Sequence, residues 1–524
     1  MSSSEHQRTP PEEARPPWGL KWRSSVWFIT TVVGMGITTD LLVYSIVIPV
    51  LPFHLEGLDY SNVSALVGYL LFAYSGGLVV STPPIAWISE RFNARKLPLV
   101  LGLVALIGSQ IMLMEAPVYW VMALARVIQG ISSSVVWVVG LALLCDTTPE
   151  KYIGRQLGLA MSGLSLGLLV GPPVGGALYT RFGFRGPIIF GVIVTFIDLL
   201  GRFLIIERYE ALRWGVDPGA LDTADSEAQE IKSDPTAAYG TFEGPSTQPL
   251  DPQGADSSAV PSTSNVEAPT TEKSEGARTT VSSPTVSPPP RLSSMKVIAK
   301  LAKSSRALVA LFNTIIYGIM FTSQEPALPL HLNQVWGLDS SKVGLVYIAS
   351  VVPTLLSSPF AGWWADHKGP EWITVGCLVL SVPWFGIVII QKQLALFITA
   401  FALEYFFLAG VVAPLTSELA AVSRSLPGVG YAHVYGAFNL AYGIGAALGP
   451  LIGGQIFSHV NRGWMVLNVL SICLVTVSIV LAFVYTGEQP LLKMFAARIK
   501  PLGVSKDTSH AQEGEPAQET KKDM

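Results

Sequence analysis

Charged residues are scarce in this chain of 524 residues: Asp, Glu, Lys and Arg make up 14% of it, against roughly 25% in an average soluble domain. The formal net charge of -3 excludes the strong basic field that a nucleic-acid-binding protein would need. The three cysteines, Cys145, Cys377 and Cys473, lie within or at the ends of apolar segments without metal-like spacing. We therefore expect neither a disulfide framework nor a metal site.

Motifs of common catalytic sites are missing as well. The sequence contains no Walker-type phosphate loop, no His-Glu-x-x-His pair and no Cys-x-x-Cys pair, and its seven histidines do not cluster. The pattern therefore indicates a protein that is not an enzyme, with no cofactor.

Long apolar runs fill most of the chain, which is 50% hydrophobic with a mean hydropathy of +0.46. About twelve runs reach the roughly 20 residues that a helix needs to cross a bilayer, six within residues 26–208 and six within 307–486. We predict an all-α membrane protein whose twelve transmembrane helices form two pseudo-symmetric six-helix bundles. Residues 1–25 form the N-terminal tail and residues 487–524 the C-terminal tail. Residues 209–306 form a linker that is largely disordered, because Ser, Thr, Pro and Gly dominate it.

The orientation follows from the short loops, where Lys and Arg collect on the cytoplasmic side. Basic residues gather before spans 1 and 7 and after spans 2, 4, 10 and 12, which predicts cytoplasmic termini and a cytoplasmic linker. The sequence leaves open whether the membrane is the plasma membrane, our first expectation, or a vacuolar or vesicular one. On the opposite side, Asn62-Val63-Ser64 is a candidate glycosylation site.

Two motifs occur twice, at equivalent positions of the two halves. Span 1 ends in Pro49-Val50-Leu51-Pro52-Phe53-His54-Leu55, and span 7 ends in Pro326-Ala327-Leu328-Pro329-Leu330-His331-Leu332. We interpret His54 and His331 as loop or gate residues. The second motif is a Gly-x3-Gly-Pro-x2-Gly-Gly pattern in spans 5 and 11, made by Gly167, Gly171, Pro172, Gly175 and Gly176 and by Gly445, Gly449, Pro450, Gly453 and Gly454. Its glycines open one helix face for close packing, and its proline bends the helix.

The loops after spans 2 and 8 carry acids beside basic residues. The second of these loops runs from Gly362 through Asp366 to Gly369, and its counterpart contains Glu90 and Arg91. An acid at a helix end can form a breakable ion pair that locks one conformational state.

These residues resemble the major facilitator superfamily, and the resemblance covers the chain apart from its linker and tails. The Gly-Pro-x-x-Gly-Gly motif, the Gly-x-x-x-Asp loop and Ala125-Arg126-Val127-Ile128-Gln129-Gly130 are similar to motifs of twelve-span drug:proton antiporters. Asp40 in span 1, Glu325 in span 7 and Asp198 in span 6 resemble vesicular amine transporters and their fungal relatives, which export drugs or metabolites. The loop after span 2 departs from the family pattern, with Glu, Asn and Ala where Asp, Gly and Arg are usual.

Several ionisable residues stand inside the predicted spans, where a charge costs at least about 2.5 to 3.5 kcal/mol on insertion scales. Asp198 and Arg202 are four residues apart and can neutralise each other on one helix face. Asp40 and Glu325 have no such local partner, so we predict that they carry protons, with Arg126 as an internal counter-charge. The roles of Glu404 and Glu418, which we place nearer to span ends, stay open.

The resemblance also implies a substrate cavity. We expect it to be lined by Arg126, Gln129, Tyr44, Tyr74, Trp137, Phe321, Asn439 and Tyr442. Further acids of the amine transporters fall at Ala409 and Asn439, and their span 2 lysine falls near Ser75. This departure makes neutral or anionic organic substrates as acceptable as amines.

We therefore predict a monomeric proton-coupled antiporter that exports a small organic molecule such as a drug, toxin, organic acid or secondary metabolite. Its partners are the substrate, protons and the lipid bilayer. Vacuolar or vesicular amine sequestration and uncoupled facilitation are the alternatives on the same fold. A membrane enzyme or receptor has no supporting motif.

Overall fold

Helices make up all the regular structure of the described part of the chain. The computed structural model describes residues 16–92, 95–149, 152–218, 300, 303–424 and 431–499. Twelve of its helical segments are long and apolar enough to cross a membrane. A helix satisfies its backbone N–H and C=O groups internally, as the hydrocarbon layer requires. The predicted all-α fold with twelve spans is confirmed.

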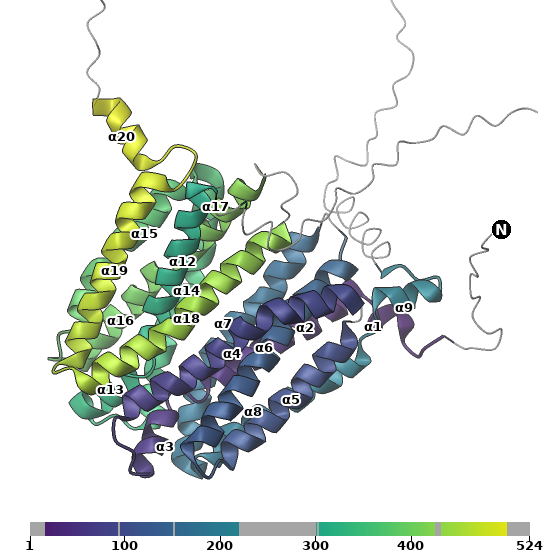
Figure 1. The fold of residues 1–524 in the computed structure, drawn as a ribbon, viewed down its shortest axis with the longest axis horizontal. Helices are drawn as coiled ribbons and strands as arrows, with labels where there is room; N and C mark the ends of the chain where they lie inside the picture. Colours follow the sequence, from purple (N-terminus) through teal and green to yellow (C-terminus); the bar gives the residue numbers. More distant parts are fainter. Residues whose placement is uncertain are drawn as a thin grey trace, which may run out of the picture.

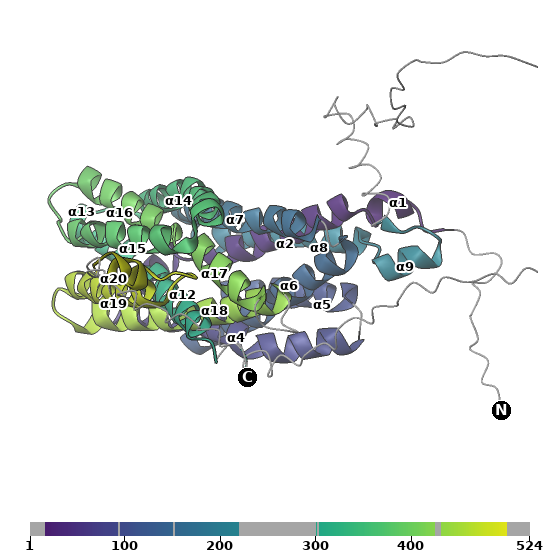
Figure 2. The same ribbon diagram turned by 90° about the horizontal axis from the view of Figure 1, so that it is seen from above.

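The spans fall into two sets of six. The N-terminal half consists of α2 (Val26–Ser45), α4 (Val63–Phe92), α5 (Lys96–Met114), α6 (Tyr119–Thr147), α7 (Ile153–Phe182) and α8 (Arg185–Leu204). The C-terminal half consists of α12 (Ser305–Ser323) with α13 (Leu328–Trp336), α14 (Ser340–Lys368), α15 (Pro370–Ile387), α16 (Leu394–Ala409) with α17 (Val412–Arg424), α18 (Tyr431–His459) and α19 (Gly463–Tyr485). Figures 1 and 2 show the halves as two adjacent bundles, purple to blue and green to yellow.

Large apolar side chains face outward from both bundles. Val80 is 77% exposed, Trp120 80% and Leu356 71%. In water, exposed apolar faces of this extent would favour aggregation, whereas lipid tails solvate them. The membrane is therefore the natural solvent of the outer surface.

The halves meet through two helix pairs, α4 with α18 and α7 with α14. Their tightest contacts lie at the end of the molecule that carries α13 and the short helix α3 (Leu51–Gly57), called the α3–α13 end below. There Ser64 Oγ donates to the Pro326 carbonyl at 3.0 Å, and Ser340 Oγ donates to the Pro49 carbonyl at 2.9 Å. In Figure 1 the bundles lean apart toward the opposite end, where α9 and α20 lie. The two bundles are therefore closed against each other at the α3–α13 end.

The duplicated Pro-x-Leu-Pro-x-His-Leu motif forms that closed end. Its prolines lack an N–H donor, so α2 stops at Ser45 before α3 begins, and α12 stops at Ser323 before α13 begins. The first long helix therefore ends at Ser45, before the motif that the sequence placed at the end of span 1. The two histidines lie in these short helices, not in loops as expected.

Each histidine of the motif stacks on an aromatic ring at the start of the last helix of its own half. His54 lies over Phe184 with ring centroids 3.6 Å apart, and His331 lies over Trp464 at 4.3 Å. Partial burial lowers the pKa of His54 below its ordinary value of 6.5, so its ring stays neutral in the stack near pH 7. The repeat thus fixes α3 and α13 to α8 and α19.

Short helices also occupy parts of the predicted tails and linker. They are α1 (Leu20–Arg23) in the N-terminal tail, α9 (Arg208–Arg213) at the start of the linker and α20 (Leu491–Ile499) in the C-terminal tail. Leu20, Ile206 and Ala211 bury one another where α1 meets α9. The predicted linker therefore begins with a short helix. Residues 219–299, to which most of the disorder prediction refers, lie outside the described residues.

Candidate functional site

Asp40 lies at the centre of the N-terminal half, 1% exposed on α2. Its Oδ2 accepts hydrogen bonds from Ser133 Oγ at 2.7 Å and from Trp137 Nε1 at 2.9 Å, both on α6. Tyr74 Oη on α4 lies 3.0 Å from Ser133 Oγ and 3.3 Å from Asp40 Oδ1, so its single proton is shared between them. The carboxyl group is surrounded by neutral donors.

Arg126 is fully buried one helix away on α6. Its Nη1 donates to Gln129 Oε1 at 2.8 Å, while Nε and Nη2 have no hydrogen-bond partner. The guanidinium carbon lies 4.9 Å from the ring centroid of Tyr74 and 5.7 Å from that of Tyr44, within the range of cation–π attraction. Arg126, the expected counter-charge of the two acids, is therefore bound to the Gln129 amide and to the rings of Tyr44 and Tyr74 in this conformation.

Glu325 occupies the break between α12 and α13 and is 5% exposed. Its Oε2 accepts a hydrogen bond of 2.6 Å from Tyr44 Oη, which belongs to the other half. The second predicted proton carrier thus joins the two bundles directly. A cavity of about 20 Å³, room for about one water molecule, adjoins it and is lined by Ser45, Ile48, Leu168, Pro172, Phe321, Glu325, Tyr347, Ser350, Val351 and Tyr405.

Aromatic rings of the C-terminal half surround Glu325. Phe321 packs against Tyr405 with centroids 5.2 Å apart, and Tyr317 packs against Tyr442 at 5.9 Å. Of the predicted cavity residues on this side, Phe321 lines the small cavity, whereas Asn439 and Tyr442 lie half-buried on α18. Together these rings offer flat apolar faces beside an acid, which suits stacking of an aromatic or otherwise planar ligand.

Several residues of this centre were not predicted, among them Ser133, Tyr317, Tyr347 and Tyr405. Ser133 carried a usable signal, because it precedes Trp137 by four residues on one helix and so lies on the same face. The three tyrosines had no such signal, because any aromatic residue in a span packs as readily against lipid or a neighbouring helix.

The duplicated glycine motif packs helices within each half and between the halves. The Cα atoms of Gly167 and Gly171 face the backbone of α2, and those of Gly445 and Gly449 face α12. Gly175 and Gly453 meet the carbonyls of Ile46 and Ser323 in the same two helices. This is the close packing that the sequence predicted.

The last glycine of each motif has a different neighbour, in the opposite half. A Cβ atom on Gly454 would lie 2.5 Å from the Ser64 carbonyl oxygen, and one on Gly176 would collide with the Ser340 carbonyl. The prolines Pro172 and Pro450 similarly turn their carbonyls toward Gly344 and Gly68 of the other half. The motif therefore closes the α3–α13 end as well as bending a helix.

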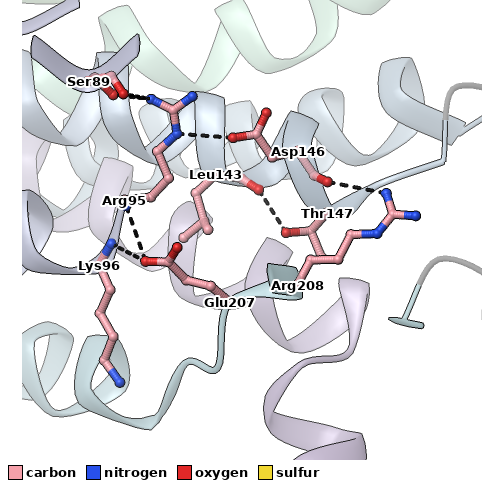
Figure 3. A network of polar contacts seen from close by, with 8 residues as sticks. All are labelled: Ser89, Arg95, Lys96, Leu143, Asp146, Thr147, Glu207 and Arg208. Atoms are coloured by element: carbon pink, nitrogen blue, oxygen red, sulfur yellow. Dashed lines mark hydrogen bonds and ion pairs between the residues drawn. The ribbon is translucent and has the colours of Figure 1, made fainter. Parts of the chain in front are cut away.

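The loop motif after α4 works through a residue other than those predicted (Figure 3). Arg95 Nε pairs with Asp146 Oδ2 on α6 at 3.0 Å, and its backbone N–H donates to Glu207 Oε1 at 3.1 Å. Arg91 lies exposed over the Trp87 ring of its own helix, 5.4 Å from the centroid. Its part in an interhelical ion pair stays a prediction. The side chain of Glu90 lies outside the described residues.

The corresponding loop of the C-terminal half is described in part. Gly362 lies on α14 with room for ordinary contact with Ala413, and Gly369 adopts a φ of 83° where α14 ends and α15 begins. That left-handed conformation favours glycine. The side chain of Asp366 lies outside the described residues, and Asn62, the glycosylation candidate, is exposed just before α4.

Two of the remaining buried acids have ionic partners. Asp198 and Arg202 lie 3.4 Å apart on α8, as their spacing predicted. Glu418, 1% exposed, accepts two hydrogen bonds from Arg306, at 2.7 and 3.0 Å. Glu404 is also 1% exposed, so neither Glu404 nor Glu418 is exposed at the protein surface.

Comparisons with known proteins agree with this architecture. The family model described as Major Facilitator Superfamily matches residues 23–248 and 310–512. The MFS-type transporter ppzB of Metarhizium rileyi is 26% identical over 90% of this chain and 97% of its own. The synaptic vesicular amine transporter of Rattus norvegicus is 21% identical over 78% of this chain and 65% of its own. Among solved structures, a D-xylose-proton symporter covers 88% of this chain and 97% of its own, with a TM-score of 0.62 and 13% identity.

Proposed function

This chain belongs to the major facilitator superfamily of membrane transporters, and from that premise we propose that it exports a small organic molecule in exchange for protons. Family membership makes it a transporter and not an enzyme. The proton coupling, the direction and the substrate class are the proposal.

The hydrogen bond from Tyr44 to Glu325 is the observation that carries the proposal. It joins the two halves at 2.6 Å, and its acceptor is a buried carboxyl group that forms no ion pair among the described residues. A hydrogen bond to an ionised acceptor is roughly twice as strong as one between neutral groups. A proton on Glu325 therefore weakens the link, and a substrate that displaces Tyr44 removes it.

Exchange transport needs a carrier that does not change conformation when it is empty, and this hydrogen bond provides that property. With Glu325 ionised and no substrate bound, the link holds the α3–α13 end closed and the empty carrier does not switch. Binding of a proton or of the substrate breaks the bond from Tyr44 to Glu325. Each change of conformation therefore carries either a proton or a substrate molecule. Asp40 is the second proton-binding acid. Ser133, Tyr74 and Trp137 stabilise its ionised form through hydrogen bonds, and a proton on Asp40 weakens these bonds.

The direction follows from the basic residues of the loops. They gather at the end opposite α3 and α13, which we assign to the cytoplasm. The conformation closed at the α3–α13 end is then the one that accepts substrate from the cytoplasm. Rocking of the two halves about the centre carries the substrate outward.

The substrate is assigned by chemistry alone. The rings of Tyr317, Phe321 and Tyr442 suit a planar molecule such as a drug, toxin, aromatic organic acid or secondary metabolite. The similarity to vesicular amine transporters favours an amine as the second candidate, sequestered into a vacuole or vesicle by the same exchange. Ala409 and Asn439, which replace two acids of those relatives, weigh against it.

The test is proton movement in proteoliposomes that contain the purified full chain and a lumenal pH dye. Amines, organic acids and neutral aromatic compounds are added in turn, and antiport predicts that one class drives proton release. Asp40→Asn and Glu325→Gln each abolish this signal while the protein remains folded. Glu56→Gln, which alters an exposed acid of α3, is the matched control and leaves it unchanged. Substrate entry without a pH change, or full coupling in both single variants and their double variant, contradicts the proposal.

A further inference from the structure

Glu404 is a buried acid that the exchange mechanism above does not use. It lies on α16, 1% exposed, and its Oε1 accepts a hydrogen bond of 2.8 Å from Gln324 Nε2. Gln324 Nε2 also donates to Asn468 Oδ1 on α19 at 3.1 Å. Three side chains from three helices thus form one buried polar cluster.

The orientation of the cluster is fixed from one end. Asn468 Nδ2 donates to the Trp464 carbonyl at 2.8 Å, so its Oδ1 must be the acceptor that faces Gln324. Gln324 therefore directs its NH₂ group toward both Asn468 and Glu404. A flipped Gln324 amide would place its oxygen against the Asn468 oxygen and lose that hydrogen bond.

Two buried oxygens of this cluster have no hydrogen-bond partner, Glu404 Oε2 and Gln324 Oε1. Both are acceptors while Glu404 is ionised, and leaving them unpaired in the interior is unfavourable. They belong to side chains that one hydrogen bond already holds together. A proton on Glu404 Oε2 can be donated to Gln324 Oε1, which completes a two-bond acid–amide pair and satisfies both atoms.

No positive charge compensates Glu404 in the part of the chain that the structure describes: it takes part in none of the ion pairs found there. The titratable groups that interact with Tyr405, the next residue on α16, are Glu404 itself, Glu325, Tyr347 and Tyr317. His331 of α13 stacks on Trp464, whose carbonyl accepts from Asn468, and makes a tilted contact with Phe397 of α16. Glu418, by contrast, is a buried acid that pairs with Arg306.

We propose that Glu404 is a further proton-binding site of this transporter, protonated in this conformation and paired through both carboxyl oxygens with the Gln324 amide. Gln324 directly precedes Glu325, and its carbonyl accepts from Leu328 N at 2.8 Å where α12 gives way to α13. Loss of the Glu404 proton leaves two oxygens facing each other. Their repulsion moves Gln324, and with it the segment that presents Glu325 to Tyr44.

Glu404 is therefore a positioning residue for the proposed coupling site, and this part of the inference rests on the proposed function. Its protonation state does not, because it is a property of the cluster alone. The protonation of Glu404 and its effect on the coupling site are tested separately, because the protonation state can be measured without measuring transport.

The experiment is infrared difference spectroscopy of the full-length protein in lipid at pH 7, comparing wild type with Glu404→Gln. The expected result is loss of one C=O stretching component of a protonated carboxyl group. The component persists in the Asp40→Asn, Glu325→Gln double variant, which assigns it to neither coupling acid. Glu115→Gln, an exposed acid paired with Arg185, is the control and changes only the carboxylate region.

Glu404→Gln is expected to fold, because a second amide can form the same two hydrogen bonds with Gln324. If it does not, Gln324→Leu decides: without the Gln324 N–H that donates to its carbonyl oxygen, the protonated Glu404 carbonyl band shifts to higher frequency. A spectrum in which Glu404→Gln removes only carboxylate absorption, or in which Gln324→Leu leaves the protonated band unmoved, overturns the proposal. Absence of proton coupling in the wild-type protein, with the protonated band present, would overturn the proposed function and leave this site standing.

Discussion

Arg202 and Asp198 show how a single glycine accommodates a buried ion pair. Both side chains are 1% exposed or less, and they lie against α2 at Gly36. A Cβ atom on Gly36 would collide with Arg202 Nη2 and lie 3.2 Å from Asp198 Oδ2. The guanidinium has nowhere to move, because every part of it is enclosed. The ion pair that the sequence predicted within α8 therefore also requires a glycine on the neighbouring helix α2.

Gly36→Ala should destabilise the protein by about 1–3 kcal/mol, the usual cost of overpacking a core. Thermal unfolding of the purified protein in detergent measures the effect. Gly34→Ala, two residues earlier on the same helix, is the control, because its Cβ would have its nearest neighbour at an ordinary 3.4 Å. Equal melting temperatures for the two variants would show that Arg202 can leave its position.

Equivalent elements of the two halves make equivalent local contacts. Each half interrupts its first helix with prolines and stacks the following histidine on the first aromatic ring of its last helix. Each half also uses the last glycine of its Gly-Pro-x-x-Gly-Gly motif against the other half, Gly176 at Ser340 and Gly454 at Ser64. The symmetry of the sequence is thus a symmetry of contacts at the α3–α13 end.

Gly454→Ala should loosen that end, because the added methyl group pushes α18 away from the start of α4. A cysteine at Ser64, 1% exposed, reports the change in a protein whose three native cysteines are replaced. We expect its labelling by a membrane-impermeant maleimide to accelerate several-fold. Gly436→Ala on the same helix meets nothing within 4 Å and should leave the labelling rate unchanged. Unaltered labelling in Gly454→Ala would mean that α18 adjusts within its own half.

The whole molecule is held in its closed-end conformation by few polar links. Besides the hydrogen bonds of Ser64 and Ser340, the bond from Tyr44 to Glu325 is the one that a proton can alter directly. It lies deeper than the glycine contacts, so it connects the chemistry of the centre to the separation of the halves.

Tyr44→Phe should therefore shift the conformational balance away from the state closed at the α3–α13 end. A hydrogen bond to a charged acceptor is worth about 1.5–3 kcal/mol, enough to populate a second state measurably. Spin labels on the exposed residues Leu58 and Val460, one in each half at that end, should show an additional longer distance. Tyr69→Phe, which changes an exposed ring of α4, is the matched control. Identical distance distributions in both variants would assign the closure to packing alone.

The sequence by itself determined the twelve spans, their division into two halves and the residues at the centre, because burying charge in a membrane is expensive and a repeated motif reveals a repeated fold. Asp40, Glu325 and Arg126 were found this way, whereas Tyr44 and Trp137 were expected as aromatic residues of the substrate cavity. Helix boundaries at the prolines and the short helices α1, α9 and α20 were less well predicted, since local breaks depend on tertiary contacts.

Only the tertiary structure decided which of these residues touch. The bond from Tyr44 to Glu325 spans 281 positions. The Glu404 cluster joins α16, α19 and the break after α12, and Arg95, just before α5, reaches Asp146 on α6 and Glu207 just before α9. Hydropathy reports that a helix is buried but says little about its rotation or its neighbours. The contacts between the halves are set by how two bundles dock, and that docking is a property of the folded molecule as a whole.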